Sequence, residues 1–240
     1  MTADRSVTVV MPVYNEAALL APAVTAVGGF LGKRPAWRYE ILIVESGSTD
    51  GTGDVADRLA ASTPCVRVIH EGAKRGFGSA LRLGWAEAAC TWVWLVTADV
   101  PFPLEAFDEA AGLAGQHDAI LSYRTGDPRG IGRRFRSAVF NALVKTVLRL
   151  HVRSVNSAFK LLRTDLVRSL PLTSNGWLID AEVLYWMERA GARWTEIPVR
   201  VIERTSGRST VGVATPIAVI RELVHFLRTK DARGASVRTR

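Results

Sequence analysis

Carboxylate side chains stand at two places where short apolar runs of the sequence end. Glu45 and Asp50 lie in the turn 45–51, which also holds two glycines and three small hydroxyl residues, so the backbone can bend tightly there. A carboxylate in such a turn can accept hydrogen bonds from a nucleotide base or a ribose. For Asp50 taken alone, the simpler role of capping the next helix is favoured.

The second place is Asp99, which follows the apolar run 92–96 and precedes Pro101 and Pro103. A carboxylate in a stiff loop can bind Mg²⁺ or Mn²⁺, hard ions that prefer oxygen ligands and bridge to a diphosphate. Capping of its own loop explains Asp99 equally well when the residue is considered by itself.

Positive charge is concentrated in one part of the chain, whose formal net charge is +8. Between residues 124 and 168 only Asp127 and Asp165 oppose eleven basic residues: Arg124, Arg129, Arg133, Arg134, Arg136, Lys145, Arg149, Arg153, Lys160, Arg163 and Arg168. Such a stretch attracts phosphate on a nucleotide, a lipid or a nucleic acid. A solvated helix face explains any single arginine better, but anion binding is favoured for the cluster. Nucleic-acid binding is disfavoured because the stretch holds few aromatic residues on which bases could stack.

Several other classes of protein are excluded by missing patterns. Cys65 and Cys90 form neither a disulfide framework nor a metal motif, and two buried thiols in a reducing cytosol are expected. Dinucleotide-binding, P-loop and nucleophile-elbow fingerprints are absent from the sequence, and its four histidines are scattered. The N-terminus lacks a signal peptide's apolar stretch, and no uncharged run reaches the roughly 20 residues of a spanning helix. A soluble or peripheral protein of one domain is therefore expected.

Apolar runs alternate with helix-period segments in the first half of the chain. Strands are predicted at 7–11, 40–44, 66–70, 92–96 and 119–122, and helices at 16–31, 52–61, 76–89 and 104–113, the first of them capped by Asn15. This alternation predicts an α/β fold with a mostly parallel sheet covered on both faces. The second half is less regular, with helices at 133–150, 177–190 and 216–228, strands at 157–162 and 194–202, and a loose basic tail.

Ligands of such sheets bind beyond the carboxyl ends of the strands. The polar residues that could carry chemistry follow the predicted strands at these ends: Asn15, Glu16, Glu45, Asp50, Lys74, Arg75, Asp99 and Arg124. The sequence therefore predicts one polar rim along a single edge of the sheet.

Short motifs run along nearly the whole chain, and their order and spacing are specific in combination. They are Val-Met-Pro-Val-Tyr-Asn-Glu at 10–16, Val-Glu-Ser-Gly-Ser-Thr-Asp-Gly-Thr at 44–52, the glycine-bearing segment 76–84, Thr-Ala-Asp at 97–99, Ser-Tyr-Arg at 122–124, Ser-Ala-Phe-Lys at 157–160, Asp-Ala-Glu at 180–182, Glu-Ile-Pro-Val at 196–199 and Arg-Thr-Ser-Gly-Arg-Ser at 204–209. With them the chain resembles the family-2 glycosyltransferases of GT-A fold, most closely the polyprenyl- and dolichyl-phosphate mannose and glucose synthases.

The resemblance implies a GT-A, Rossmann-like three-layer sandwich that forms one domain over residues 1–230. Residues 1–125 would bind the nucleotide-sugar and residues 126–230 the acceptor, with a basic tail at 231–240. It implies inverting transfer of a hexose from a UDP- or GDP-sugar, with Mg²⁺ or Mn²⁺ at Asp99. The donor site would comprise Pro12, Tyr14, Asn15, Glu16, Glu45, Ser46, Ser48, Lys74, Ala98 and Asp99.

The resemblance also places Arg124, Arg136 and Lys160 at the acceptor, and Asp99, Asp180, Glu182 and Arg204 among the catalytic residues. A polyprenyl phosphate arrives as an anion and requires positioning rather than a strong base, since the second pKa of a phosphate monoester is about 6. A sugar or natural-product hydroxyl would require a base, for which Asp180 and Glu182 are the candidates. Capping the helix 177–190 and pairing with an arginine is the competing role for these two carboxylates.

Three acidic positions of the family pattern are altered, at Ser46, Thr97 and Ser154. We expect weaker metal binding at Thr97 and hypothesise that Arg204, with Lys160 or Arg208, supplies part of the missing stabilisation. The same changes keep open a non-catalytic domain that binds a nucleotide-sugar, and the fold alone also allows a nucleotidyltransferase. A cytoplasmic protein is expected, peripheral on the inner membrane face, with the basic amphipathic segment 133–153 on anionic lipid. Core packing of that segment's apolar side is the competing interpretation.

Overall fold

The computed structural model describes residues 4–126, 131–202 and 215–234, and within these ranges the side chains of 131–136, 215–217 and 232–234 are not described. Three side chains that were predicted to contact phosphate, Arg136, Arg204 and Arg208, lie outside the described residues. No helix in the described part of the chain is both long enough and apolar enough to cross a bilayer.

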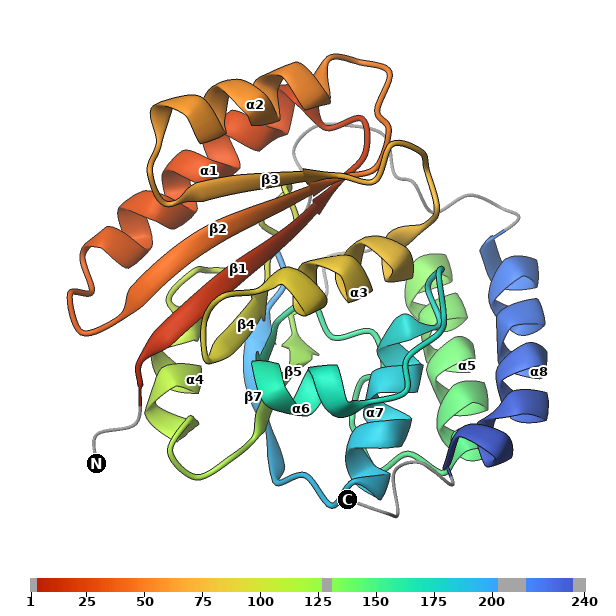
Figure 1. The fold of residues 1–240 in the computed structure, drawn as a ribbon. Coiled ribbons are helices and arrows are strands. Elements are labelled where there is room, and N and C mark those ends of the chain that lie inside the picture. Colours follow the sequence, from red (N-terminus) through yellow and green to blue (C-terminus); the bar gives the residue numbers. More distant parts are fainter. Residues whose placement is uncertain (1–3, 127–130, 203–214, 235–240) are drawn as a thin grey trace.

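A seven-stranded sheet with the order β3-β2-β1-β4-β6-β5-β7 forms the centre of the protein (Figure 1). Its strands are β1 (Ser6–Val13), β2 (Arg38–Glu45), β3 (Val66–His70), β4 (Trp92–Leu95), β5 (Ala119–Thr125), β6 (Lys160–Arg163) and β7 (Trp194–Arg200). β6 pairs antiparallel with β4 and β5, and every other pairing is parallel. The carboxyl ends of six strands therefore lie along one edge.

Helices cover both faces of this sheet, as the near-continuous apolar strands require. They are α1 (Ala17–Gly32), α2 (Thr52–Ser62), α3 (Phe77–Glu87), α4 (Ala106–Leu113), α5 (Ile131–Leu148), α6 (Thr164–Ser169), α7 (Ile179–Arg189) and α8 (Thr215–Gly234). α1, α2 and α4 share a core with Val7 and Val9 of β1, whereas α3, α5, α6, α7 and α8 share a core with Val10. The predicted three-layer α/β sandwich is confirmed.

Several local predictions need correction. Ser157–Ala158–Phe159 precede β6 instead of belonging to it, and β6 is the antiparallel strand, which no local pattern foretold. The short helix α6 was not predicted. α8 continues to Gly234, so residues 231–234 of the expected tail are helical. The helix propagates beyond residue 228 because each added residue gains a backbone hydrogen bond once the helix exists.

α3 approaches the sheet closely because Gly84 faces β1 and β2. A Cβ atom at Gly84 would lie 2.4 Å from Val10 Cγ1 and 3.2 Å from Val44 Cγ2. The missing side chain therefore sets the distance between α3 and the strands that end at the polar rim.

We predict that Gly84→Ala lowers the free energy of unfolding by about 1–3 kcal/mol, the usual cost of overpacking a filled core. Gly29→Ala in α1 is the matched control, because no atom lies within 4 Å of its added Cβ. The control should be neutral, or more stable by up to about 1 kcal/mol, since glycine is unfavourable inside a helix. Urea denaturation of both variants gives the comparison, and equal midpoints would contradict the close contact.

Candidate functional site

The candidate site lies where the chain changes direction across the sheet. From β1 the chain moves outward to β2 and β3 and then returns to β4 on the other side of β1. Such a switch point leaves a crevice at the carboxyl ends of the strands, the usual ligand site of open α/β sheets. Glu45 ends β2, and Asp99 follows β4 by four residues. Two strand spacings, about 10 Å, separate the ends of these strands.

The loops after β1 and β2 are hydrogen-bonded to each other at this crevice. The backbone N–H of Asn15 donates to Ser48 Oγ at 3.0 Å, and the N–H of Thr49 donates to Asn15 Oδ1 at 2.8 Å. Asn15 adopts a left-handed conformation with φ of 55°, which asparagine tolerates better than most residues. The two predicted donor loops thus form one structural unit.

The N-terminus of α1 is capped by the neighbouring turn rather than by its own sequence. The backbone N–H of Glu16 donates to Thr52 Oγ1 at 2.8 Å, and that of Ala17 donates to Asp50 Oδ2 at 3.2 Å. The prediction that Asn15 caps α1 is therefore wrong, because its amide oxygen is bound to the other loop. Asp50 Oδ1 also accepts from the N–H of Thr52 at 3.0 Å, so one carboxylate supports the starts of both α1 and α2.

Glu45 uses its carboxylate to hold its own turn. Its Oε1 accepts from the N–H of Ser48 at 2.5 Å, and its Oε2 lies 3.1 Å from His70 Nδ1. The other ring nitrogen of His70 lies 2.9 Å from Asp57 Oδ1. Burial acts to raise the pKa of Glu45, but the bonds from Ser48 and His70 outweigh it and the pKa is lowered. The hydrogen bonds to Asp57 and then Glu45 raise the pKa of His70 above its ordinary value.

Ser46 is linked to α3 through a residue that the sequence analysis missed. Its hydroxyl donates to Glu71 Oε2 at 2.6 Å, and Ser79 at the start of α3 donates to Glu71 Oε1 at 2.7 Å. The available signal was position, because Glu71 directly follows β3 as Glu45 ends β2. Glu71 therefore supplies a carboxylate beside the position where the family pattern has an aspartate and this chain has Ser46.

Two more predicted donor residues contact each other beside this turn. The ammonium of Lys74 lies 3.8 Å from the centre of the Tyr14 ring, a cation–π contact. Gly47, with φ of 68°, lies so close to the backbone that an added Cβ would be 2.9 Å from Ala73 Cα. Pro12 lies within β1, paired in register with Val44. The loops after β1, β2 and β3 therefore meet around the turn 45–51.

Asp99 lies in a tight turn after β4. The Thr97 hydroxyl donates to Asp99 Oδ1 at 2.6 Å, and the N–H of Val100 donates to the Thr97 carbonyl at 2.9 Å. Val100 has φ of 38°, an unfavourable conformation for a β-branched residue and one that is concentrated at functional sites. Ala98 between them is buried.

Asp99 and Thr97 provide a suitable but small set of oxygen ligands for a divalent cation. No group of three or more His, Cys, Asp or Glu side chains that could hold a metal ion occurs among the described residues. Mg²⁺ commonly uses one or two carboxylates together with substrate phosphates. The residues present therefore fit a metal that binds together with a diphosphate.

Two residues predicted to bind the acceptor, Arg124 and Lys160, come together with Asp180, which was predicted to be catalytic. Lys160 opens β6 in register with Leu121, and its ammonium donates to the Ser157 carbonyl and lies 3.2 Å from Asp180 Oδ1. Arg124 donates to the Asn156 carbonyl at 3.3 Å. Burial raises the pKa of Asp180, and the charges of Lys160 and Arg124 offset part of that rise. Lys160 is almost fully buried, and its ammonium is engaged by both the Ser157 carbonyl and Asp180.

Glu182 faces a backbone loop instead of the rim. Its carboxylate accepts from the N–H of Thr173 at 3.0 Å and from the N–H of Ser174 at 2.7 Å, and its side chain is fully buried. The loop 173–178 also packs on α3, where the N–H of Ser79 donates to the Asn175 carbonyl at 3.1 Å. Glu182 thus holds the loop 173–178, and its catalytic role stays a prediction.

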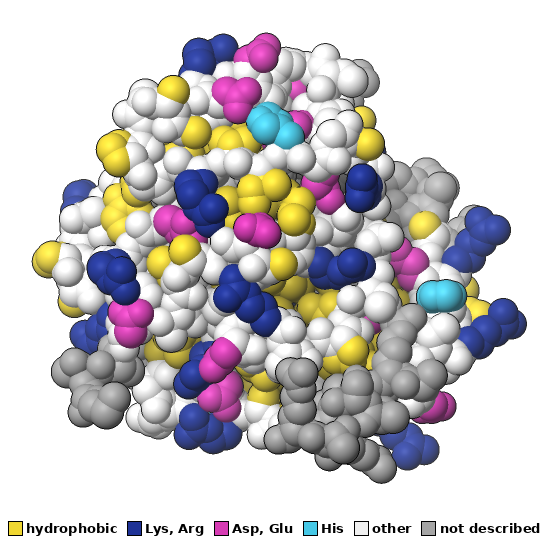
Figure 2. All heavy atoms as spheres, viewed as in Figure 1, with side chains coloured by type: hydrophobic (Ala, Val, Ile, Leu, Met, Phe, Trp, Pro, Cys, Tyr) yellow, Lys and Arg dark blue, Asp and Glu magenta, His cyan; other side chains and the backbone are white. Residues whose placement is uncertain are grey.

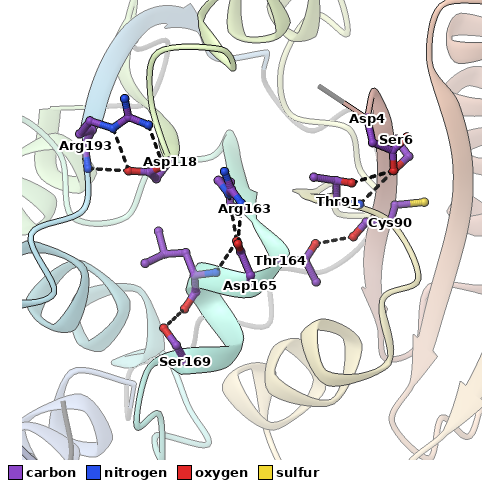
Figure 3. Close-up of polar contacts among 11 residues, drawn as sticks. Asp4, Ser6, Cys90, Thr91, Asp118, Arg163, Thr164, Asp165, Ser169 and Arg193 are labelled. Carbon is purple, nitrogen blue, oxygen red and sulfur yellow. Dashed lines mark hydrogen bonds and ion pairs between the residues drawn. The ribbon is translucent and has the colours of Figure 1, made fainter. Parts of the chain in front are cut away.

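At the opposite edge of the sheet, where β5 and β7 begin, polar side chains are paired with one another (Figure 3). A surface hollow of about 280 Å³ there is lined by Asp118, Arg163, Asp165, Leu166 and Ser169. Its charges already form the ion pairs Arg193–Asp118 and Arg163–Asp165 shown in Figure 3. The carboxyl edge, where carboxylates and hydroxyls hold the loops after β1, β2 and β4, is the better candidate.

We predict that His70 contributes pH-dependent stability. Because its pKa is raised in the folded state, protonated His70 stabilises the fold below its ordinary pKa of 6.5, and this contribution is lost as the pH rises through the folded-state pKa. His70→Asn should therefore be destabilising at about pH 5.5, with a difference from wild type that shrinks toward about pH 9. Urea denaturation across this range gives the measurement, and a pH-independent difference would contradict the ion pairs.

We predict that Lys160→Met lowers the free energy of unfolding by about 3–5 kcal/mol near pH 7, because it leaves the buried Asp180 carboxylate without its nearest counter-charge. The double variant Lys160→Met, Asp180→Leu should recover most of the loss, since an apolar pair can replace a buried ion pair. Thermal and urea unfolding of the single and double variants give the coupling energy. Additive losses would show that the two residues do not form an energetic pair.

Comparisons with known proteins agree with this arrangement. The family model described as Glycosyl transferase family 2 matches residues 8–170. The glycosyltransferase AglD of Haloferax volcanii is 30% identical over 206 residues, 82% of this chain but 33% of AglD, so the chain spans about a third of that relative. The undecaprenyl-phosphate mannosyltransferase of Micrococcus luteus is 27% identical over 212 residues, which cover 83% of this chain and 85% of that protein.

Solved structures show the same fold at low identity. Glucosyl-3-phosphoglycerate synthase from Mycobacterium tuberculosis, in complex with Mn²⁺, UDP and phosphoglyceric acid, matches 93% of this chain and 78% of its own, with a TM-score of 0.70 and 21% identity. The mannosyltransferase PcManGT from Pyrobaculum calidifontis, in complex with GDP-Man and Mn²⁺, matches 85% of this chain and 58% of its own, with a TM-score of 0.59 and 22% identity. These likenesses confirm the expected GT-A fold, and the match of the family model to more than half of the sequence shows that the chain belongs to glycosyl transferase family 2.

Proposed function

We propose that this protein transfers a hexose, with inversion, from a UDP- or GDP-sugar to a polyprenyl phosphate. The observation that carries the proposal is the hydrogen-bonded pair of loops after β1 and β2, at the switch point of the sheet and on the same edge as Asp99. Relatives whose names specify polyprenyl phosphate acceptors support the choice of acceptor. Residues 1–125 would bind the donor and residues 126–230 the acceptor.

The donor is proposed to lie across the loops that the hydrogen bonds hold together. Pro12, Tyr14, Asn15, Glu16, Ser46, Ser48, Lys74 and Ala98 are the candidate contacts. Glu45 is proposed to shape the turn for the nucleotide, because its carboxylate is engaged by Ser48 and His70. Lys74, held over the Tyr14 ring, provides a positive charge next to the proposed diphosphate position.

Departure of the nucleoside diphosphate is the step that needs charge stabilisation. Asp99, oriented by the Thr97 hydroxyl, would hold a Mg²⁺ or Mn²⁺ ion together with the diphosphate. A cation in this position neutralises negative charge that grows on the leaving group. We further propose that Arg204 adds to this stabilisation. Lys160, which beside Arg208 was a candidate to act with Arg204, is engaged by Asp180 and is proposed to support the site through that ion pair.

The acceptor phosphate is already an anion, so the protein's task is to orient it. Arg124 and Arg136 are the proposed phosphate contacts, because a guanidinium can bind phosphate oxygens in a bidentate manner. Asp180 interacts electrostatically with Arg124 and is proposed to orient that side chain rather than to act as the base. We place the protein in the cytoplasm, peripheral on the inner face of a membrane that holds the acceptor lipid.

We predict that Asp99→Asn removes the Mn²⁺-dependent part of donor binding. A ligand that binds only the native state raises its melting temperature, so wild type should melt higher with the cognate nucleotide-sugar and Mn²⁺ together than with either alone. A panel of UDP-, GDP- and dTDP-sugars identifies the donor, and transfer to a polyprenyl phosphate should fall by about 10²-fold or more in the variant.

Asp165→Asn at the opposite edge is the matched control and should keep both the melting shift and the transfer activity. An unchanged Mn²⁺-dependent shift in Asp99→Asn would rule out Asp99 as the metal ligand. Absence of transfer or donor hydrolysis by wild type with every donor would favour a non-catalytic domain instead.

A further inference from the structure

Large apolar side chains are exposed mainly on two helices of the acceptor half. Among the described residues, the large hydrophobic side chains that are exposed are Val139, Leu143 and Val147 on α5, Ile220 and Val224 on α8, and Ile202 after β7, with exposed fractions of 40–52%. The residues on each helix are four positions apart, so they form one stripe per helix. We call these two stripes together the apolar ridge.

The opposite sides of the same helices pack into the protein around α7. Val144 and Leu148 of α5 are buried in one core cluster with Leu223 and Phe226 of α8, and the Phe226 ring lies 5.0 Å from that of Tyr185 in α7. Figure 1 shows α5 and α8 on the flank of the molecule, outside α7. The ridge is therefore the outward face of helices whose inner faces are already filled.

The surroundings of the ridge are basic. No acidic residue occurs between Asp127 and Asp165, a stretch that contains all of α5. On α8, Glu222 turns inward, where its carboxylate accepts from the N–H of Leu178 at 3.1 Å, and Asp231 near the end of the helix pairs with Lys230. Figure 2 shows Lys and Arg side chains standing out from the flank over α8. The charged rim of the ridge therefore favours a negatively charged surface.

Beyond the last turn of α5, a hollow of about 500 Å³ continues this basic rim. It is lined by Arg149, His151, Glu188, Arg189, Ala192 and Trp194. The Arg149 side chain is exposed, and the Arg189 guanidinium lies over the Tyr185 ring at 3.5 Å. The one carboxylate of this lining, Glu188, accepts a hydrogen bond from the backbone N–H of His151. The remaining basic and aromatic groups, next to an apolar stripe, match the phosphate and glycerol region of a lipid head group beside its acyl chains.

We propose that the apolar ridge of α5 and α8 docks on an anionic bilayer, with the hollow at Arg149 facing the head groups. The proposal rests on the proposed lipid acceptor and adds the face of the protein that meets the membrane. A second copy of the chain fits the ridge less well, because a self-complementary contact would bring two basic rims together. Helices with an apolar face and a basic rim bind at the membrane interface without spanning it.

Docking on this face has a direct structural connection to the candidate site. Glu222 of α8 holds the start of α7, and Gly176 packs so closely on Glu222 that an added Cβ would lie 2.2 Å from its Oε1. The loop 173–178 in turn accepts a hydrogen bond from Ser79 of α3. α8 is thus connected to the carboxyl edge of the sheet through the loop 173–178 and α3. A docked α8 would therefore fix the distance between the candidate site and the lipid surface.

Vesicle co-sedimentation of the whole chain tests the proposal. Wild type should bind vesicles of phosphatidylcholine with phosphatidylglycerol, bind pure phosphatidylcholine far less, and lose much of its binding at high salt. Leu143→Ser combined with Ile220→Ser should weaken partitioning to anionic vesicles by about tenfold, because both side chains would enter the apolar boundary. Since both are exposed, the melting temperature should stay close to that of wild type.

Ile202→Ser is the matched control, since it removes an equally exposed side chain outside the ridge and should leave partitioning unchanged. Wild-type binding that is absent, or that the double variant leaves intact, would overturn the docking surface. A wild-type dimer that the double variant converts to monomer, without vesicle binding, would assign the ridge to a second copy and also overturn it. Transfer to a short, water-soluble polyprenyl phosphate separates the two proposals. The double variant should retain this transfer even if it no longer binds vesicles. Loss of the transfer in wild type and in every variant would instead contradict the proposed function.

Discussion

The parallel pairing of β1 with both β2 and β4 is the constraint on which the candidate site depends. Because the three strands run in one direction, the loops after them must emerge at the same edge. Asn15, the turn 45–51 and Asp99 follow these strands and are therefore neighbours, although 84 residues separate Asn15 from Asp99 in the sequence. Cross-loop hydrogen bonds then hold the first two loops as a unit before any ligand is present.

Hydroxyl groups replace two carboxylates that the family resemblance leads one to expect. Ser46 donates to Glu71, and Thr97 donates to Asp99. A hydroxyl can donate a hydrogen bond to a neighbouring carboxylate, whereas a second carboxylate would repel it. The rim therefore retains negative charge at fewer positions, which suits a metal that binds together with the donor diphosphate rather than in its absence.

The acceptor half is organised around buried charges. Lys160 can lie toward the rim because β6 runs antiparallel, so the first residue of β6 pairs with Leu95 at the end of β4 and with Leu121 of β5. Its ammonium then meets Asp180 at the start of α7, while Glu182, two positions further on, faces the loop 173–178. Adjacent carboxylates on one helix thus have different surroundings because side chains two residues apart point in different directions. α7 itself is enclosed by the sheet and by α5 and α8, so those helices present their remaining apolar side chains outward.

Much of this protein follows from the sequence because the governing patterns are local. Runs such as 41–44 and 92–95 are apolar throughout, which predicts strands buried on both faces, and the alternation with helices predicts the parallel sheet and its polar edge. The motif series identified the family for the same reason, since short segments in a set order can be read without coordinates. Asp99 and the turn 45–51 were placed on the correct edge by their positions after strands.

Tertiary structure alone decided which partner each polar group takes. Glu71 with Ser46, Asp50 with the start of α1, and Lys160 with Asp180 are contacts between segments 20 or more residues apart, which no local periodicity specifies. The same limit applies to α5, whose sequence has apolar residues on two sides. Burial of Val144 and exposure of Leu143 depend on where α7 lies, because a helix buries whichever face its neighbours cover.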